Sequence, residues 1–228
     1  PMNFCWQVEL HSHTVWSRDC VVQPERVMKL CEARHIDKIA ITDHNTAEGA
    51  LRLHRDLPDR VIVGEEIMTT KGELLGYFMQ ETIPAGLTPQ ETIRRLREQG
   101  AVISVSHPFD RLRKGAWHEA DLREIVDQVD AIEIFNARCL YPEDNRRALA
   151  FAQEHHLVGT AGSDAHCRIE YGRAYLRMPA FYDAQSFKDA LHAADLVSRY
   201  SLAWVHINSK TAKWAKKLHL QPRLWDGG

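Results

Sequence analysis

The feature that most constrains the fold of this chain is a regular alternation of short apolar runs with longer amphipathic runs. The apolar runs predict strands at residues 4–10, 38–42, 60–67, 73–79, 101–105, 130–135, 158–161 and 173–178. A hairpin through Lys71 and Gly72 is expected to join 60–67 to 73–79. The amphipathic runs predict helices at residues 24–34, 46–55, 88–99, 118–127, 143–156, 183–193 and 209–218. Because strand and helix alternate about seven times, the pattern favours a parallel α/β fold, either a barrel or a doubly wound sheet.

Length and composition favour one globular domain over residues 1–228, with 209–228 forming a C-terminal helix and tail packed on it. The formal net charge of -2 gives no reason to expect a general polyanion-binding surface. The cationic run 208–220 could alternatively contact nucleic acid or an acidic partner, but helix packing is the favoured reading. Five cysteines without a CxxC pair, and no membrane-length apolar run, predict a cytoplasmic protein without a membrane partner. The oligomeric state stays open.

Polar side chains fall at the carboxyl ends of the predicted strands. In chain order they are His11 and His13, Asp43 and His44, Glu65 and Glu66, His107, Asn136, and Asp164 and His166. In a parallel barrel these ends converge on one face, so residues far apart in sequence share one pocket. Imidazole and carboxylate ligands in such numbers suit zinc, manganese or iron.

Any one of these histidines, taken alone, is more often a hydrogen-bonded structural or surface residue than a metal ligand. Their shared position after successive strands is what favours a metal site. Six other histidines lie in predicted helices or at their ends and are assigned a structural or solvated role: His35, His54, His155, His156, His192 and His219.

Five ordered motifs, "HSHT" with the later Asp19, "ITDHN", "GEE", "SHPF" and "GSDAH", resemble those of the PHP (polymerase and histidinol phosphatase) superfamily. The resemblance covers about residues 8–175, and "GRAYL" after the last motif is similar to small stand-alone phosphoesterases of that superfamily. It implies a distorted seven-stranded (β/α)7 TIM-like barrel with the active site at the carboxyl ends of the strands. It also implies a cofactor of roughly two to three divalent metal ions, manganese, zinc or iron.

The resemblance implies a ligand set residue by residue. A first metal is expected between His11, His13, Glu66 and Asp164, a second between Glu66 and His107, and a third between Asp19, His44 and His166. Alternation along the strand turns Glu65 away from the metals, and Asp43 is expected to orient a ligand from behind.

Two positions depart from the family pattern. Tyr141 stands where several members carry a histidine, so the second metal lacks a ligand there. Cys139 could be a substitute ligand, or it could be a buried thiol. Asp19 stands where some members carry a histidine, and its harder oxygen shifts the preference toward manganese or iron.

The expected function is hydrolysis of a phosphate ester by a metal-activated hydroxide, on a small phosphomonoester, a nucleotide or a short oligonucleotide end. Residues with a catalytic role would be Asp19, His44, Asp164 and His166, and phosphate would be bound by Arg138 above all, or by Arg168, Arg173 and Arg18. Trp16, Phe109 and Trp117 are equally interpretable as stacking or as core residues. The alternatives are a metal-dependent hydrolase of a C–N bond and a metal-binding barrel without turnover.

Overall fold

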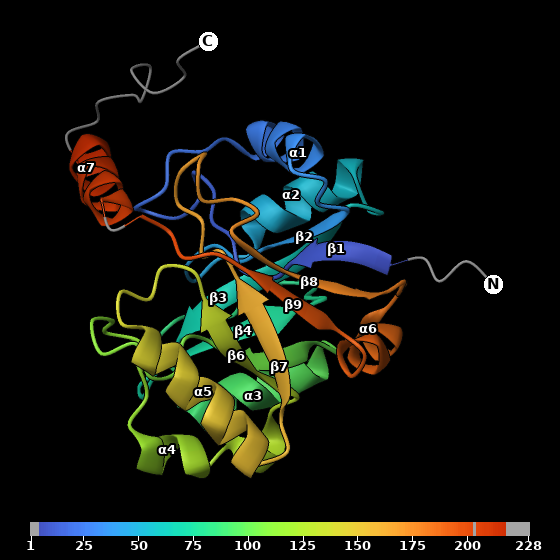
Figure 1. Cartoon of the computed structure of the whole chain (residues 1–228), viewed down its shortest axis with the longest axis vertical. Helices are drawn as coiled ribbons and strands as arrows, with labels where there is room; N and C mark the ends of the chain where they lie inside the picture. Colours follow the sequence, from blue (N-terminus) through green and yellow to red (C-terminus); the bar gives the residue numbers. More distant parts are fainter. Residues whose placement is uncertain (1–4, 203, 218–228) are drawn as a thin grey trace.

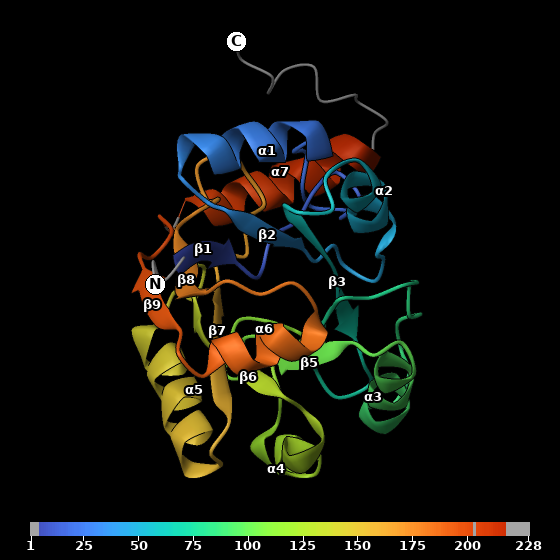
Figure 2. The same ribbon diagram turned by 90° about the vertical axis from the view of Figure 1, so that its right-hand side faces the viewer.

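A computed structural model describes residues 5–202 and 204–217 and shows one sheet of nine strands with helices packed around it (Figures 1 and 2). The strands are β1 (Cys5–Glu9), β2 (Lys38–Ile41), β3 (Val61–Met68), β4 (Glu73–Tyr77), β5 (Val102–Val105), β6 (Ala131–Asn136), β7 (Val158–Gly162), β8 (Ala174–Pro179) and β9 (Asp195–Ser198). The helices are α1 (Pro24–Ala33), α2 (Glu48–Asp56), α3 (Pro89–Glu98), α4 (Glu119–Arg123), α5 (Pro142–Glu154), α6 (Ala184–Leu191) and α7 (Val205–Lys217), with a 3-10 turn at Val126–Gln128.

The sheet is an α/β barrel that is nearly closed. Its strand order is β7-β6-β5-β4-β3-β2-β1-β8-β9. Beyond the ends of β1 and β7, a parallel bridge joins Ser12 to Ala165, and the amide of Asp164 donates to the carbonyl of His11 at 2.8 Å. Strand β7, at one end of the sheet, therefore meets β1 at the polar motifs, and this contact gathers the site.

The strand count departs from the prediction, and so do the directions of β8 and β9, whereas the predicted hairpin between β3 and β4 is confirmed. Seven strands are not confirmed, because β8 pairs antiparallel with β1, and β9, which was not predicted, pairs antiparallel with β8. Strand β4 is antiparallel to both of its neighbours, β3 and β5. The turn between β3 and β4 is too short for the crossover that a parallel pair requires, so a hairpin forms there.

Both faces of the sheet are buried. Along β2, Ile39 and Ile41 pack into one hydrophobic cluster, whereas Ala40, between them, packs into another. The first cluster includes helix residues such as Leu96 of α3, and the second includes Phe187 of α6. Burial on both faces explains why these strands read as continuous apolar runs.

Helix starts follow the sequence signals. Proline occupies the first turn of α1, α3 and α5, where a missing amide costs little. At α3, the Thr88 side chain accepts a hydrogen bond from the Glu91 amide at 3.2 Å. These local signals set the helix boundaries within a few residues of the predicted ones.

Helix α7 begins at Val205, earlier than predicted, and contacts the loop that follows β1. Its Lys216 side chain donates to the carbonyls of Val15 and Ser17 at 2.5 and 2.6 Å. The rest of the predicted C-terminal segment, 218–228, lies outside the described residues. Among the described residues, no helix is long and apolar enough to cross a membrane.

Candidate metal centre

The two histidines that follow β1 face two carboxylates from distant parts of the chain. His13 Nε2 lies 3.1 Å from Asp164 Oδ1 and 3.4 Å from Glu66 Oε2. His11 Nε2 lies 3.3 Å from Glu66 Oε1 and 3.7 Å from Asp164 Oδ1. All four side chains are fully buried. Two imidazoles and two carboxylates thus surround one point, as the resemblance implies for a first metal.

The other predicted ligands surround this group. His107 Nε2 lies 3.0 Å from Glu66 Oε1. On the opposite side, Asp19 Oδ1 lies 3.3 Å from His166 Nε2 and 3.6 Å from His44 Nε2. The structure therefore brings all eight predicted ligands into one cluster, and their binding of metal stays a prediction.

Several buried atoms of the cluster form no well-aligned hydrogen bond among the described residues and lie close only to one another. They are His11 Nε2, His13 Nε2, Asp19 Oδ1, Glu66 Oε2 and Asp164 Oδ1. Buried polar atoms are nearly always paired, because an unpaired one retains its full desolvation cost. Nitrogen and oxygen atoms that converge and lack other partners fit a divalent cation, which would satisfy all of them.

Two chains of hydrogen bonds hold the histidines from behind. Asp43 accepts from the Ser17 hydroxyl at 2.6 Å, and Ser17 Oγ lies 3.1 Å from His13 Nδ1, so Asp43 acts on His13 through Ser17. Glu133 Oε1 lies 2.9 Å from His11 Nδ1. In both cases the Nδ1 atom is engaged and Nε2 is left for a metal. Sequence reasoning missed Glu133, although a charged residue inside the apolar run AIEIF was a usable signal.

The pKa directions differ among the ligands of the cluster. Burial, together with the neighbouring His166 and His44, lowers the pKa of His13 well below its usual value. Burial opposes ionisation of Glu66, but the adjacent imidazoles of His11 and His44 hold its pKa well below the usual range. Burial opposes protonation of His11, His44 and His107, but neighbouring carboxylates, Glu133 beside His11 and Glu66 beside the other two, raise the pKa of all three imidazoles. Metal binds neutral imidazole and ionised carboxylate, so binding at these three histidines would release protons.

Glu65 points away from the cluster, as strand alternation predicts. Its Oε2 atom accepts from the Ile83 amide at 2.9 Å, and burial raises its pKa to about 8. Five described histidines that were assigned a structural role join none of the ligand groups: His35, His54, His155, His156 and His192. The sixth, His219, lies outside the described residues.

Two further charged side chains reach the cluster and were not predicted. Glu73, the first residue of β4, places Oε2 3.5 Å from His107 Nε2. Arg113, in the loop after β5, forms an ion pair with Asp164, and its Nε lies 3.4 Å from Asp110 Oδ2. No strand-end rule points to either residue, because one begins an antiparallel strand and the other lies in a loop.

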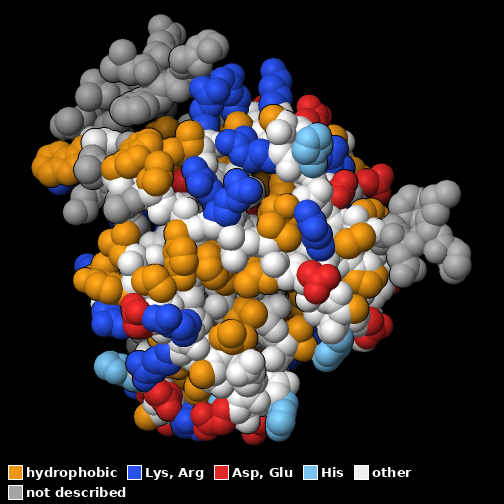
Figure 3. Space-filling model, viewed as in Figure 1, with side chains coloured by type: hydrophobic (Ala, Val, Ile, Leu, Met, Phe, Trp, Pro, Cys, Tyr) orange, Lys and Arg blue, Asp and Glu red, His pale blue; other side chains and the backbone are white. Residues whose placement is uncertain are grey.

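The cluster opens into a pocket of about 820 Å³. Its lining includes the cations Arg18, Arg113, Lys114 and Lys213 beside Asp19, His44 and Glu73. The Lys213 side chain, from α7, places Nζ 3.3 Å from Asp19 Oδ2. In Figure 3, Lys and Arg side chains gather on the upper half of the visible face.

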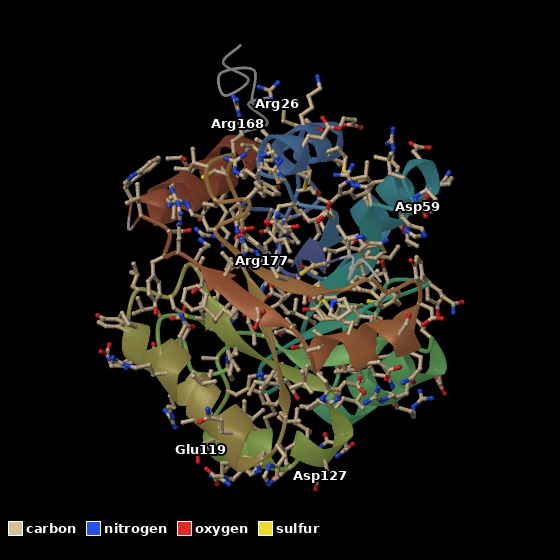
Figure 4. All side chains as sticks on the ribbon, turned by 45° about the vertical axis from the view of Figure 1, so that its right-hand side comes forward. Arg26, Asp59, Glu119, Asp127, Arg168 and Arg177 are labelled. Atoms are coloured by element: carbon tan, nitrogen blue, oxygen red, sulfur yellow. The ribbon has the colours of Figure 1, made fainter. Side chains whose placement is uncertain are left out.

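Arg18 is the predicted arginine that lines this pocket. Arg138 is buried, with Nε 3.1 Å from Glu170 Oε1, and Arg173 Nε donates to the Ile169 carbonyl at 3.2 Å. Arg168 lies at the end of the molecule that also carries Arg26 (Figure 4). These three arginines do not line the pocket.

The structure also shows where the three aromatic candidates and the two residues near the second metal position lie. Phe109 and Trp117 are buried and belong to the hydrophobic core, whereas Trp16 is 42% exposed. Tyr141 is exposed, and the Arg111 guanidinium lies 4.7 Å from its ring centre. Cys139 is buried and its thiol contacts Asp110 at 3.5 Å. Burial raises the pKa of this thiol far above its usual value, which favours a buried structural thiol at this position.

Known proteins resemble this chain in sequence and in fold. The family model PHP_C, described as PHP-associated, matches residues 142–196. An uncharacterised protein of Methanocaldococcus jannaschii is 38% identical over 175 residues, which are 75% of this chain and 70% of that protein.

Among solved structures, a two-domain protein from Bacteroides vulgatus that contains a predicted PHP-like metal-dependent phosphoesterase matches with a TM-score of 0.67 and 19% identity. The match covers 86% of this chain and 65% of that one. An amidohydrolase from Chromobacterium violaceum, with bound sulfate and no metal, matches with a TM-score of 0.56 and 16% identity over 70% of this chain and 87% of that one. At these identities the structural matches show the fold alone.

Proposed function

The chain belongs to the PHP superfamily, and from this premise we propose that it is a metal-dependent phosphoesterase acting at the cluster around Glu66. The observation that carries the proposal is the convergence of buried, unpaired ligand atoms from His11, His13, Glu66 and Asp164. A barrel that had lost its activity would have little reason to retain so many buried ionisable groups, since burying each one costs stability.

The proposed cofactor is roughly two to three divalent ions, manganese, zinc or iron. The first would be held by His11, His13, Glu66 and Asp164, the second by Glu66 and His107, and the third by Asp19, His44 and His166. When bound, such ions supply Lewis acidity toward phosphate oxygens and lower the pKa of water. Asp19 adds a hard oxygen ligand, which favours manganese or iron.

The protein's own groups would orient the substrate. Arg18, Arg113 and Lys213 line the pocket beside the carboxylates and can bind the oxygens of a phosphate ester. Asp43, acting through Ser17, fixes the ring of His13 so that it need not reorganise during the reaction. The pocket volume of about 820 Å³ accommodates a small phosphomonoester, a nucleotide or the end of a short oligonucleotide.

The test is to measure bound metal and hydrolysis in the same preparation. Purified protein is analysed for metals and assayed with manganese on 4-nitrophenyl phosphate, bis(4-nitrophenyl) phosphate and a nucleoside bisphosphate. His13→Ala and Asp164→Asn are expected to lose bound metal and phosphate release together. Bound metal without turnover of any phosphate ester would reject the phosphoesterase and direct the search to C–N bonds, the chemistry of the amidohydrolase that shares this fold.

A further inference from the structure

The second metal position is short of ligands. Only Glu66 and His107 serve it under the family pattern, and Tyr141, at the position where a histidine would assist, is 43% exposed and packs beside Arg111. Cys139 is a buried thiol that contacts Asp110. Neither residue supplies the missing ligand, and a divalent ion held by one imidazole and one shared carboxylate would be weakly bound.

We propose that Glu73 is the missing protein ligand of this second metal, so that a carboxylate from β4 takes the place of the absent histidine. The inference rests on the metal centre of the proposed function and assigns one more residue to it. Glu73 Oε2 lies 3.5 Å from His107 Nε2, and Glu73 Oε1 lies 3.9 Å from His44 Nδ1. A ligand atom of Glu73 also lies within 4.8 Å of ligand atoms of Glu66 and of His44, the latter assigned above to the third metal.

Topology explains how a residue from β4 reaches this position. Strand β4 pairs antiparallel with β3 and with β5, and Glu73 is opposite Met68 at the end of β3. Its amino end therefore lies at the edge where its neighbours have their carboxyl ends. Glu73 begins the strand at the same level as the residues that follow β5, among them His107.

The carboxylate of Glu73 is confined. The Glu73 amide donates to the Gly115 carbonyl at 3.0 Å, and Trp117 Nε1 donates to the Glu73 carbonyl at 3.0 Å. A Cβ atom on Gly115 would lie 1.9 Å from Glu73 Oε2, so glycine is what lets the loop close over the carboxylate. The side chain is only 7% exposed. A carboxylate held in place before metal binds loses little conformational freedom when it coordinates.

Charge supports the same assignment. Glu73 and Glu66 are two buried carboxylates beside the same two histidines, His44 and His107, and like charges repel strongly in such a buried site. A cation between them removes this repulsion and also satisfies the imidazoles. The competing explanation is that Glu73 pairs with a protonated histidine and stabilises the fold without binding metal.

The experiment counts ions in matched variants. Metal-free protein is titrated with manganese by calorimetry, and bound manganese is measured by elemental analysis after gel filtration. Glu73→Gln is compared with Glu65→Gln, which removes the neighbouring buried carboxylate that faces Ile83. Glu73→Gln is expected to bind one ion fewer, or to bind its weakest ion at least about tenfold less tightly, while Glu65→Gln behaves as wild type.

Gly115→Ala gives an independent test with Glu73 intact. The added methyl group displaces the carboxylate and is expected to weaken the same ion. If Glu73→Gln and Gly115→Ala both retain the wild-type number and affinity of ions, the assignment of Glu73 is wrong while the metal centre stands. If wild-type protein takes up no manganese, the metal centre itself is wrong, and the assignment fails with it.

Discussion

Glu133 offers a sharp test of how the metal centre is supported, because it holds two histidine residues and never faces the metal positions itself. One oxygen lies 2.9 Å from His11 Nδ1, and the other accepts from the His107 amide at 2.8 Å and from Asn136 Nδ2 at 3.1 Å. In Glu133→Gln the amide group of the new side chain must face either the imidazole or two donors. At least one hydrogen bond to a charged group is lost, at a cost of about 1.5–3 kcal/mol.

The same magnitude follows from metal chemistry. Removing a residue that orients a metal-binding histidine typically weakens metal affinity by about 10–100-fold. That range corresponds to about 1.4–2.7 kcal/mol, which agrees with the hydrogen-bond estimate. Calorimetric titration of metal-free Glu133→Gln with manganese should show this loss at the ion bound by His11. Thermal unfolding with and without a chelator should show a smaller metal-dependent stabilisation than in wild type. A dissociation constant within about twofold of wild type would refute the orienting role.

Three other substitutions have distinct expected outcomes. The pKa of Glu65 is raised from 4.5 to about 8, so the contribution of its protonated form to stability is lost as the pH rises through that interval. The melting temperature of Glu65→Gln should therefore exceed that of wild type by a margin that grows between about pH 5 and pH 9. A pH-independent difference would contradict this. A Cβ on Gly162 would lie 2.1 Å from the Cβ of His11, so Gly162→Ala should destabilise the fold by about 1–3 kcal/mol or more in chemical denaturation and reduce manganese uptake. Lys213 is 60% exposed beside Asp19, so Lys213→Ala should leave the melting temperature unchanged and raise KM for 4-nitrophenyl phosphate, more at low salt than at high salt. An unchanged KM at low salt would exclude Lys213 from substrate binding.

The sequence predicted most elements and the main cluster because both depend on local patterns. Apolar runs marked every described strand except β9, whose four residues DLVS are largely exposed and carry no such run. The polar residues after β1, β2, β3, β5 and β7 converge because these strands run in the same direction around the barrel. The family pattern of glycine, one variable residue and glutamate selected Glu66, and strand alternation then placed Glu65 on the opposite side.

Strand direction and loop conformation were harder to predict from the sequence. Direction in β8 and β9 depends on which edge of β1 is left free, which is a property of the whole sheet. The four arginines proposed for phosphate were chosen by nearness in sequence to the motifs. Only Arg18 lines the pocket, and Arg138 instead forms a buried ion pair with Glu170, whose other oxygen accepts from the His166 amide. Arg113 reaches the cluster because its loop folds back over β4, which no local pattern encodes.

The rule that active-site residues follow parallel strands has a counterpart that this barrel illustrates. An antiparallel strand inserted among parallel strands has its amino end at the edge where the parallel strands have their carboxyl ends. The first residue of such a strand therefore lies beside the residues that follow the parallel strands. Glu73 begins β4, and its buried carboxylate comes directly after a glycine turn, where a charged side chain would ordinarily be solvated. A charged residue that opens an apolar run after a tight turn is therefore a candidate site residue whenever the turn is too short for a crossover, and Glu73 would have been found on that criterion alone.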